Sequence, residues 1–536
     1  MGQACGVSDL SVATEEVVIQ GPLTSFIEQR RRIILGFFVA IAAGAQFQAL
    51  STGPFYRDDA WVVLTNRVPL GTAVRMVSTM PGFTMFERFW SGLAPHSTWF
   101  SQLPSIAAGL AAIVALYALV KWEGFETWIA LSAAFGLAVS SEATTFGTHI
   151  KPYSANILIT IALIWLAERV RKEQKLTNLV ALGAASIAAC IFSYTLFIVV
   201  VPIFVVINAE AIFLRRAMGA TIATDGAVGL ALIIEYSMIR HLITPALQQS
   251  WTYFYIHLDS LSHAQSSIHR AVGGLFRGST IGYSAHAPWI FGYISEILVA
   301  LLVLIGLLSA FRQRVLAVSV LGLAVALAMV DRVPIGTDRT DTYLYPFLFL
   351  LGASGLAWIA RYAKRLPTPA LRGLIGVGIF FVATSCFVRV IDAPAYPGGG
   401  LQPAIAEVQS AIKAPGAMVL VEGTARWPWA YYMEPTIRLA FGQSFNTGFT
   451  PVSSLPYVVI SPHTIVEQRF NPGRVVEKLR SAKRVVTINY GDVTGLADPL
   501  QTALVRHCWV PVSRHTYDRY IVTQLVRNPF PNCSPL

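Results

Sequence analysis

The chain has 536 residues, of which 54% are hydrophobic and only 13% are charged, and its mean hydropathy is +0.56. A soluble domain carries about 25% charged residues, so this composition excludes a soluble globular protein and indicates a polytopic membrane protein. The net charge of +11 would favour nucleic-acid binding in a soluble chain. Here much of it lies in short loops as a topology signal, so no nucleic-acid partner is expected.

The first 32 residues precede the first apolar run. The opening 29 are polar and lack a cationic start followed by an apolar stretch with a small-residue cleavage site. Such a segment is not a removable signal peptide. We therefore expect residues 1–32 to form a cytoplasmic tail and the first span to act as an uncleaved anchor.

Membrane-length apolar runs follow one another through residues 33–390, which predicts a polytopic α-helical domain with about eleven transmembrane helices. The runs begin near Ile33, Leu103, Thr127, Ser154, Asn178, Leu196, Ala220, Pro288, Val315, Thr342 and Leu374. Cationic residues fall in alternate loops, at positions that include Arg30, Lys121, Arg171, Arg215, Arg314 and Lys364. Because such clusters accumulate on the cytoplasmic side, we expect a multi-pass cell-membrane protein with a cytoplasmic N-terminus and a periplasmic or extracellular C-terminal domain.

The first exterior segment, residues 51–102, is rich in aromatic and charged side chains. Asp58 and Asp59 come just after the first apolar run. Each carboxylate would cost about 3 kcal/mol at the bilayer centre, so the pair is expected at the outer water interface. Apolar residues then recur at helical spacing between turns at residues 68–69 and 80–82, which predicts two short interfacial helices. An Asp–Asp pair after a helix is also a common turn signal.

A second long exterior loop covers residues 241–287 and contains aromatic residues and histidines, among them Trp251 and His257. A loop of this length usually binds or covers something, so it is a candidate substrate lid. Its histidines lack compact metal-ligand spacing and indicate loop residues.

Three cationic residues are expected on the exterior side, although lysine and arginine accumulate in cytoplasmic loops. They are Lys151, Arg332 and Arg339. Binding of an anion, such as the phosphate of a lipid substrate, would explain them. The structural alternatives are snorkelling of Lys151 to the interface and pairing of Arg339 with Asp338 or Asp341.

The tail, residues 391–536, alternates short apolar runs with polar helical patterns and is long enough for a small extracytoplasmic α/β domain. Strands are predicted at residues 417–421, 457–460, 484–488 and 520–522, with helices at residues 403–413 and 473–482. Cys508 and Cys533 lie in this exported tail, where disulfides form. The sequence leaves their pairing open.

The order of these features resembles that of the C-type, polytopic membrane glycosyltransferases, in particular the protein O-mannosyltransferase and aminoarabinose transferase group. Asp58-Asp59, two interfacial helices and residues 99–109 opening the second span correspond to the start of that pattern. His149-Ile150-Lys151-Pro152-Tyr153-Ser154 resembles the group's acidic-x-basic-x-Tyr segment, and residues 336–346 resemble its later arginine-containing loop before a Pro-bearing helix. The resemblance covers residues 33–390. His149 stands where many relatives have a carboxylate.

The resemblance implies a hexosyl- or pentosyltransferase that moves a sugar from a polyprenyl-phosphate donor to an acceptor on the exterior face, usually with inversion. Such a reaction needs a carboxylate to accept the nucleophile's proton and cations to stabilise the departing phosphate. We expect Asp58 to be the base and Asp59 an orienting residue or metal ligand, with the reverse assignment open. The donor phosphate would be bound by Lys151, Arg339 and Arg332, and the substrate site lined by His149, Tyr153, Arg57 and Trp61.

A polyprenyl-lipid flippase or a secondary transporter is the alternative from another class. A transporter of this kind predicts ionisable residues inside the spans and internal duplication of helices. In this sequence Glu235 is nearly the only ionisable residue within the predicted spans, and no internal repeat is evident. The expected partners are membrane lipid, the polyprenyl-phosphate donor and a glycan, lipid or protein acceptor. The choice of sugar and acceptor, the oligomeric state and the participation of a divalent cation as cofactor stay open.

Overall fold

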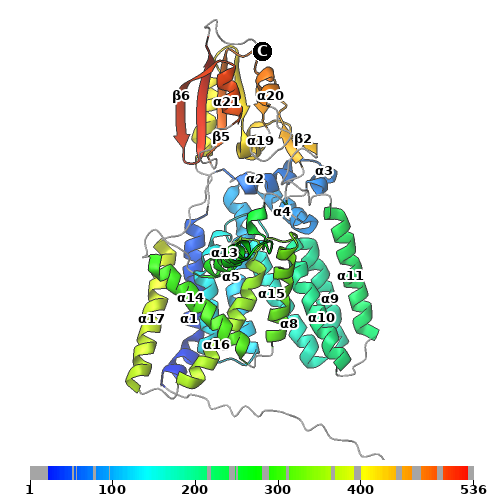
Figure 1. The fold of residues 1–536 in the computed structure, drawn as a ribbon, viewed down its shortest axis with the longest axis vertical. Coiled ribbons are helices and arrows are strands. Elements are labelled where there is room, and N and C mark those ends of the chain that lie inside the picture. Colours follow the sequence, from blue (N-terminus) through cyan, green and yellow to red (C-terminus); the bar gives the residue numbers. More distant parts are fainter. Residues whose placement is uncertain are drawn as a thin grey trace, which may run out of the picture.

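A bundle of long helices and a sheet-containing domain form the two ends of the molecule, with short helices between them (Figure 1). The computed structural model describes residues 22–50, 54–55, 57–76, 80–95, 97–213, 219–240, 248, 251–280, 289–309, 313–337, 339–363, 368–391, 400–441, 449–461, 472–491 and 499–528.

Every apolar run predicted from the sequence is a helix of the bundle. In chain order these helices are α1 (Pro22–Gln48), α5 (Thr98–Trp122), α6 (Thr127–Val139), α8 (Tyr153–Glu173), α9 (Leu176–Phe192), α10 (Phe197–Phe213), α11 (Gly219–Ile239), α14 (Trp289–Leu308), α15 (Arg314–Met329), α16 (Tyr345–Ala363) and α17 (Thr368–Ile391). Among the described residues, six helical segments are long and apolar enough to cross a membrane, and four are shorter apolar helices. The expected number of eleven spans stays a prediction.

Small residues let two of these helices approach closely. A Cβ atom built on Gly306 of α14 would lie 2.0 Å from the carbonyl oxygen of Leu351 on α16, and one on Gly355 of α16 would lie 2.0 Å from that of Leu302. Interfaces of this kind are typical of membrane helices, where close backbone packing replaces the hydrophobic effect as the driving force. The contact fixes α16, whose N-terminal end leads out of a loop that carries a candidate site residue.

Ion pairs join the helix ends that lie far from the sheet-containing domain. Arg171 near the end of α8 binds Glu168 and, on α10, Glu210, and Lys172 lies 3.6 Å from Glu123 at the end of α5. These pairs place the C-terminal ends of α5, α8 and α10 together at one end of the bundle. The opposite ends of α5 and α8 therefore face the short helices.

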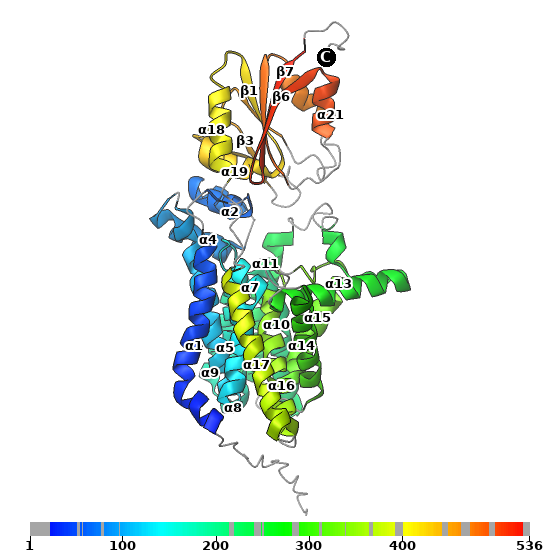
Figure 2. The same ribbon diagram turned by 90° about the vertical axis from the view of Figure 1, so that its left-hand side faces the viewer.

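The short helices of the first exterior segment are α2 (Arg57–Val63), the 3-10 turn η1 (Leu64–Arg67), α3 (Leu70–Arg75) and α4 (Pro81–Leu93). They lie between the bundle and the sheet-containing domain (Figure 2). On α4, Phe83 packs edge-on against Phe192 of α9 at 5.3 Å, while Phe89 is 68% exposed. Helices are thus present where two were predicted, with α2 in addition. Their position in the membrane interface stays a prediction.

The C-terminal domain is an α/β unit with a mixed sheet. Its elements are α18 (Leu401–Ala411), β1 (Ala417–Val421), the turn η6 (Gly423–Ala425), α19 (Arg426–Met433), β2 (Arg438–Phe441), β3 (Phe449–Val452), β4 (Val458–Ile460), α20 (Pro472–Lys478), β5 (Arg484–Tyr490), α21 (Pro499–Arg506), β6 (Trp509–Tyr517) and β7 (Tyr520–Arg527). The five-stranded sheet has the order β4-β1-β5-β7-β6. Strands β4, β1 and β5 pair in parallel, and β7 and β6 pair antiparallel.

The four predicted strands are present as β1, β4, β5 and β7, and the two predicted helices as α18 and α20. Cys508, just before β6, is disulfide-bonded, whereas Cys533 lies outside the described residues. Cys190 and Cys386 are buried free thiols within the bundle.

The described part of the second exterior loop is largely helical. It contains the turn η4 (Thr252–Phe254) and α13 (Leu261–Ser279), which runs across the ends of α14 and α15 rather than along the bundle (Figure 2). Most of residues 241–250 and all of residues 281–288 lie outside the described part. The role of this loop as a substrate lid stays a prediction.

Candidate active site

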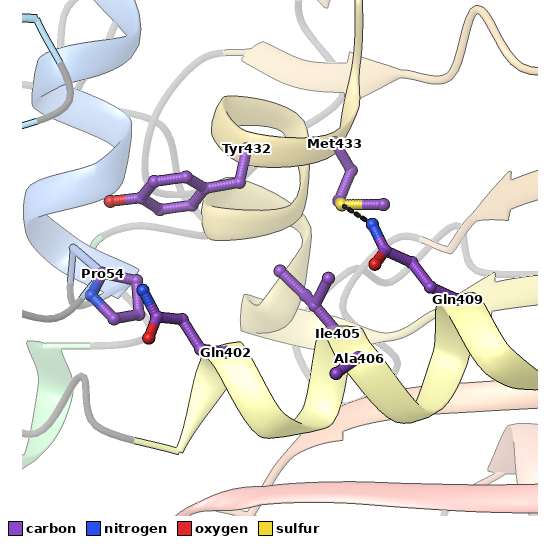
Figure 3. A pocket seen from close by; sticks show the side chains of 7 residues that line it. All are labelled: Pro54, Gln402, Ile405, Ala406, Gln409, Tyr432 and Met433. Atoms are coloured by element: carbon purple, nitrogen blue, oxygen red, sulfur yellow. Dashed lines mark hydrogen bonds between the residues drawn. The ribbon is translucent and has the colours of Figure 1, made fainter.

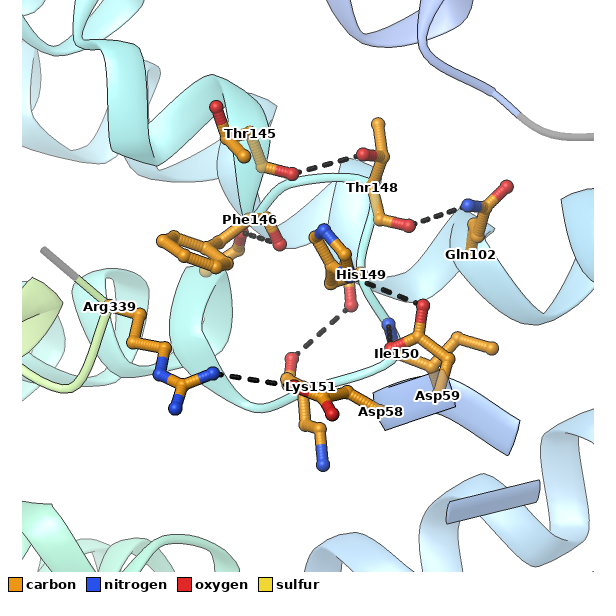
Figure 4. Close-up of polar contacts among 12 residues, drawn as sticks. Asp58, Asp59, Gln102, Thr145, Phe146, Thr148, His149, Ile150, Lys151 and Arg339 are labelled. Carbon is orange, nitrogen blue, oxygen red and sulfur yellow. Dashed lines mark hydrogen bonds and ion pairs between the residues drawn. The ribbon is translucent and has the colours of Figure 1, made fainter. Parts of the chain in front are cut away.

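Asp59 fastens the first turn of α2 to the loop before α8. The carboxylate is fully buried. Its Oδ1 accepts a hydrogen bond from the Ile150 N–H at 3.0 Å, and its Oδ2 lies 3.3 Å from Nδ1 of His149 (Figure 4). An acidic side chain in the first helical turn is also favoured by the helix dipole. Both oxygens are thus engaged, so Asp59 holds residues 149–151 in place.

Asp58 forms an ion pair with an arginine 281 residues away. Its Oδ2 lies 3.3 Å from Nη1 of Arg339, and the two side chains are 20% and 35% exposed (Figure 4). The guanidinium carbon of Arg339 also lies 5.2 Å above the ring of Trp251, at a distance typical of cation–π contacts. Asp58 therefore keeps partial access to solvent, unlike Asp59.

Lys151 brings a second cation to the same place. Its ammonium lies 4.3 Å from the ring centre of Trp61 on α2, and the residue is only 6% exposed. Burial lowers the pKa of Lys151 from 10.5 to about 8, although the charges of Asp58 and Asp59 act in the opposite direction. Lys151 is thus a poorly hydrated cation that titrates near physiological pH.

The loop before α16 positions Arg339. Asp341, which is fully buried, accepts hydrogen bonds from the Thr337 N–H at 2.8 Å and from the Thr340 hydroxyl at 3.4 Å. Thr342 then donates to the carbonyl oxygen of Tyr153 at 3.1 Å, which ties the loop to the first turn of α8. Asp341 thus shapes the loop, and the Arg339 guanidinium reaches across to Asp58.

Gly336 begins this loop and leaves no room for a side chain. Its φ is +75°, and an added Cβ would lie 2.7 Å from the Cα atom of Ala271 on α13. We expect Gly336→Ala to lower the free energy of unfolding by about 1–3 kcal/mol, because strain and a backbone clash add together. Denaturant titration in detergent micelles measures the change.

Gly322 on α15 is the matched control, since a Cβ there meets nothing within 4 Å and a helical Gly→Ala change is stabilising. Equal stability of the Gly336→Ala and Gly322→Ala variants would contradict a tightly packed loop.

Three further residues predicted for the site are Tyr153, Arg332 and Arg57. Tyr153 lies in the first turn of α8, edge-on to Phe146 at 5.1 Å. Arg332 is exposed, and its charge acts on Tyr255. The side chain of Arg57 lies outside the described part of the structure. The roles of Arg332, Tyr153 and Arg57 in substrate binding stay predictions.

Glu87 is a titratable neighbour that pattern reasoning did not single out. It lies on α4, is 1% exposed and accepts a hydrogen bond from Ser91. Burial raises the pKa of Glu87 to about 8, and the charge of Asp59 acts in the same direction. The sequence signal for this contact was the spacing of Glu87 and Ser91, which are four residues apart and so lie on the same face of a helix.

The participation of a divalent cation in this site stays a prediction. Among the described residues, no three His, Cys, Asp or Glu side chains lie close enough together to hold one. The cluster contains two carboxylates, Asp58 and Asp59, but also two cations, Lys151 and Arg339. Arg339, at 3.3 Å from Asp58, opposes the binding of a divalent ion by that carboxylate.

The chain is similar in sequence to one known family. Residues 78–255 match the model of the dolichyl-phosphate-mannose-protein mannosyltransferase family, and this stretch contains the His149 to Ser154 motif. The comparison with curated proteins found no match to this chain.

The fold is similar to that of solved membrane transferases. The crystal structures of ArnT from Cupriavidus metallidurans, one in the apo state and one bound to undecaprenyl phosphate, each share 12% identity with a TM-score of 0.50, covering 92% of this chain and 98% of that chain. Archaeal oligosaccharyltransferase AglB from Archaeoglobus fulgidus shares 11% identity with a TM-score of 0.48, covering 96% of this chain and 76% of that chain. The predicted resemblance to the C-type membrane glycosyltransferases is therefore confirmed, in sequence over residues 78–255 and in fold over most of the chain.

Proposed function

We propose that the chain is a glycosyltransferase that moves a sugar from a polyprenyl-phosphate donor to an acceptor on the exterior face of the cell membrane. The observation that carries the proposal is the meeting of Asp58, Arg339 and Lys151, from three segments far apart in sequence. The matched family is described by its dolichyl-phosphate-mannose donor, and one structure of similar fold holds undecaprenyl phosphate. A partly open carboxylate beside two cations has the groups that displacement of a lipid phosphate needs.

The proposed reaction is a single displacement at the anomeric carbon. A hydroxyl or amine of the acceptor attacks this carbon, and its proton passes to the carboxylate of Asp58. The bond between the anomeric carbon and the phosphate oxygen breaks, and the electron pair leaves with the polyprenyl phosphate. Arg339 and Lys151 balance the charge that develops on that phosphate. The products are the glycosylated acceptor and free polyprenyl phosphate.

Asp58 is the better candidate for the base. Asp59 is fully buried and already engaged by the Ile150 N–H and by His149, which supports an orienting role. Asp58 is paired with Arg339 but remains 20% exposed. A base must reach the proton that it removes within about 3 Å, and only a carboxylate with open access can do so.

The geometry supports transfer chemistry over transport. The charged groups lie in α2, at the mouth of α8 and in the loop before α16 (Figure 4), outside the middle of the bundle. A transporter would use ionisable groups within its spans. With the N-terminus cytoplasmic, as the loop charges indicate, this cluster and the C-terminal domain face the periplasm or the exterior.

Transfer in a reconstituted membrane tests the proposal. The purified full chain in liposomes is given a radiolabelled sugar on polyprenyl phosphate together with cell-envelope acceptors, and both incorporation of label and release of polyprenyl phosphate are measured. We expect the two to appear in equal amounts. Donor movement between leaflets without any release would support the transporter instead.

The charge state of Lys151 predicts a pH dependence. Its pKa in the free protein is about 8, and only the protonated ammonium stabilises a leaving phosphate. We expect kcat/KM, which reports the ionisations of the free enzyme, to fall about tenfold per pH unit above about pH 8. The Lys151→Arg variant retains its charge at every accessible pH, so it should lack this limb. If kcat/KM of that variant still fell above about pH 8, the group that titrates would be one other than Lys151.

A further inference from the structure

A small pocket on the C-terminal domain lies beside Pro54 of the first exterior segment, and we call it the junction pocket. Its volume is about 210 Å³, below the range of about 300–1,000 Å³ that holds drug-sized ligands. Seven residues line it, namely Pro54, Gln402, Ile405, Ala406, Gln409, Tyr432 and Met433 (Figure 3). It has room for one ring-sized group.

Among the described residues that line the pocket, none has an acidic or basic side chain. It combines carboxamides with apolar walls and one aromatic ring, and its polar groups are therefore neutral hydrogen-bond donors and acceptors. A phosphate or an ammonium group would find no counter-ion there. A neutral sugar ring has hydroxyl groups at its edge and apolar C–H faces, and so it matches both parts of this lining.

Two exposed glutamines on one face of α18 present their carboxamides to a ligand. Gln402 and Gln409 are seven residues apart, so they project from the same side of the helix. Within the described residues Gln402 makes no side-chain hydrogen bond, and Gln409 donates only to the Met433 Sδ atom at 3.7 Å (Figure 3). A thioether is a weak acceptor, so hydroxyl groups of a ligand would improve on this contact.

Hydrogen bonds join the walls of the pocket to the sheet and to the segment that leads into α2. Glu407 on the same helix accepts hydrogen bonds from His515, Tyr517 and Gln524 of β6 and β7, which fixes α18 on the sheet. The Tyr432 hydroxyl accepts the Phe55 N–H at 2.9 Å, three residues before Asp58. One wall of the pocket is therefore joined to the segment that leads into α2, the helix of the proposed base.

We infer that the junction pocket binds one neutral sugar ring of the acceptor, adjacent to the position that receives the new sugar. The inference rests on the proposed function for its setting, since it names the acceptor as a glycan-bearing molecule. A peptide acceptor would need an extended groove for its backbone, and a half-open pocket of ring-sized volume favours a sugar.

Saturation-transfer NMR on the full chain in nanodiscs tests binding without catalysis. The probes are the methyl glycosides of glucose, mannose and galactose, with a neutral tetrapeptide as competitor. We expect saturation of ring protons of at least one glycoside, reduced about tenfold in Gln402→Ala/Gln409→Ala and in the pocket-filling Ala406→Trp. Gln265→Ala, an exposed glutamine on α13, is the matched control and should behave as the wild type.

Glycoside saturation that is equal in all four proteins would overturn the inference, as would displacement of the glycosides by the tetrapeptide. In the transfer assay, Gln402→Ala/Gln409→Ala should raise the KM for the acceptor about tenfold and leave the KM for the donor unchanged. Absence of any transfer by the wild type would count against the proposed function alone, because glycoside binding is measured separately. Unchanged kinetics in the double variant would count against the junction pocket alone.

Discussion

Asp58→Asn is expected to lower kcat for sugar transfer by about 10²- to 10⁴-fold, the range contributed by a positioned general base. The amide preserves shape and can still accept a hydrogen bond from Arg339, which lies 3.3 Å from the carboxylate, but it cannot take the proton of the acceptor. Donor binding should change little, so the KM for the donor should stay within a few fold. Steady-state transfer with labelled donor measures both constants.

Asp59→Asn is the informative comparison, because its Oδ1 can still accept the Ile150 N–H while the charge facing His149 is lost. We expect a smaller decrease in kcat, accompanied by a lower unfolding midpoint. Asp331→Asn is the neutral control, because Asp331 is exposed and its φ of +56° is one that asparagine tolerates. A larger kcat effect for Asp59→Asn than for Asp58→Asn would reverse the assignment of the base.

Arg339→Gln is expected to lower kcat by about 10²- to 10³-fold, as removal of one preorganised donor to a developing anion does in other enzymes. The substitution removes the charge that pairs with Asp58 and that would face the leaving phosphate in the proposed reaction. It also removes the cation that lies 5.2 Å above Trp251. Single-turnover transfer, with polyprenyl phosphate release followed in time, isolates the chemical step from product release.

Arg339→Lys should recover part of the rate, because it restores the charge without the planar, forked donors of arginine. Arg480→Gln removes an arginine that pairs with Glu477 at 3.5 Å on the surface of the C-terminal domain, and it should be silent. If Arg339→Gln changed only thermal stability and left the single-turnover rate intact, Arg339 would be a structural partner of Asp58 and nothing more.

The parts of the fold that could be predicted from the sequence are those marked by one strong pattern, such as a run of apolar residues. Membrane spans require long apolar runs, and each run predicted from the sequence is a helix of the structure. The parallel strands β1, β4 and β5 are short apolar runs of the type that buried strands require. By contrast, β6 is an edge strand with mostly exposed residues, and α19 begins Arg-Trp-Pro-Trp, a composition with little helical preference.

The candidate site was partly accessible for a related reason. Asp58, Lys151 and Arg339 stood out because charges near a membrane need an explanation, and their order along the chain linked them. The partners of Asp59 include a backbone N–H group, from Ile150, that no residue pattern can reveal. The contact of Arg339 with Trp251 joins two loops whose approach depends on the packing of α13 against Gly336.

Arg67 gives the C-terminal domain a part in the architecture of the active site. Its guanidinium donates to the carbonyl oxygens of Tyr431 and Glu434, and Trp61 on α2 packs edge-on against Trp427 at 5.9 Å. Helix α2, which bears the proposed base, therefore packs between the helix bundle and the C-terminal domain. Truncating the chain after α17 would expose Trp61 and remove the contacts that hold α2. The shortened protein would then lose activity through misplacement of Asp58, even if the removed domain never touches a substrate.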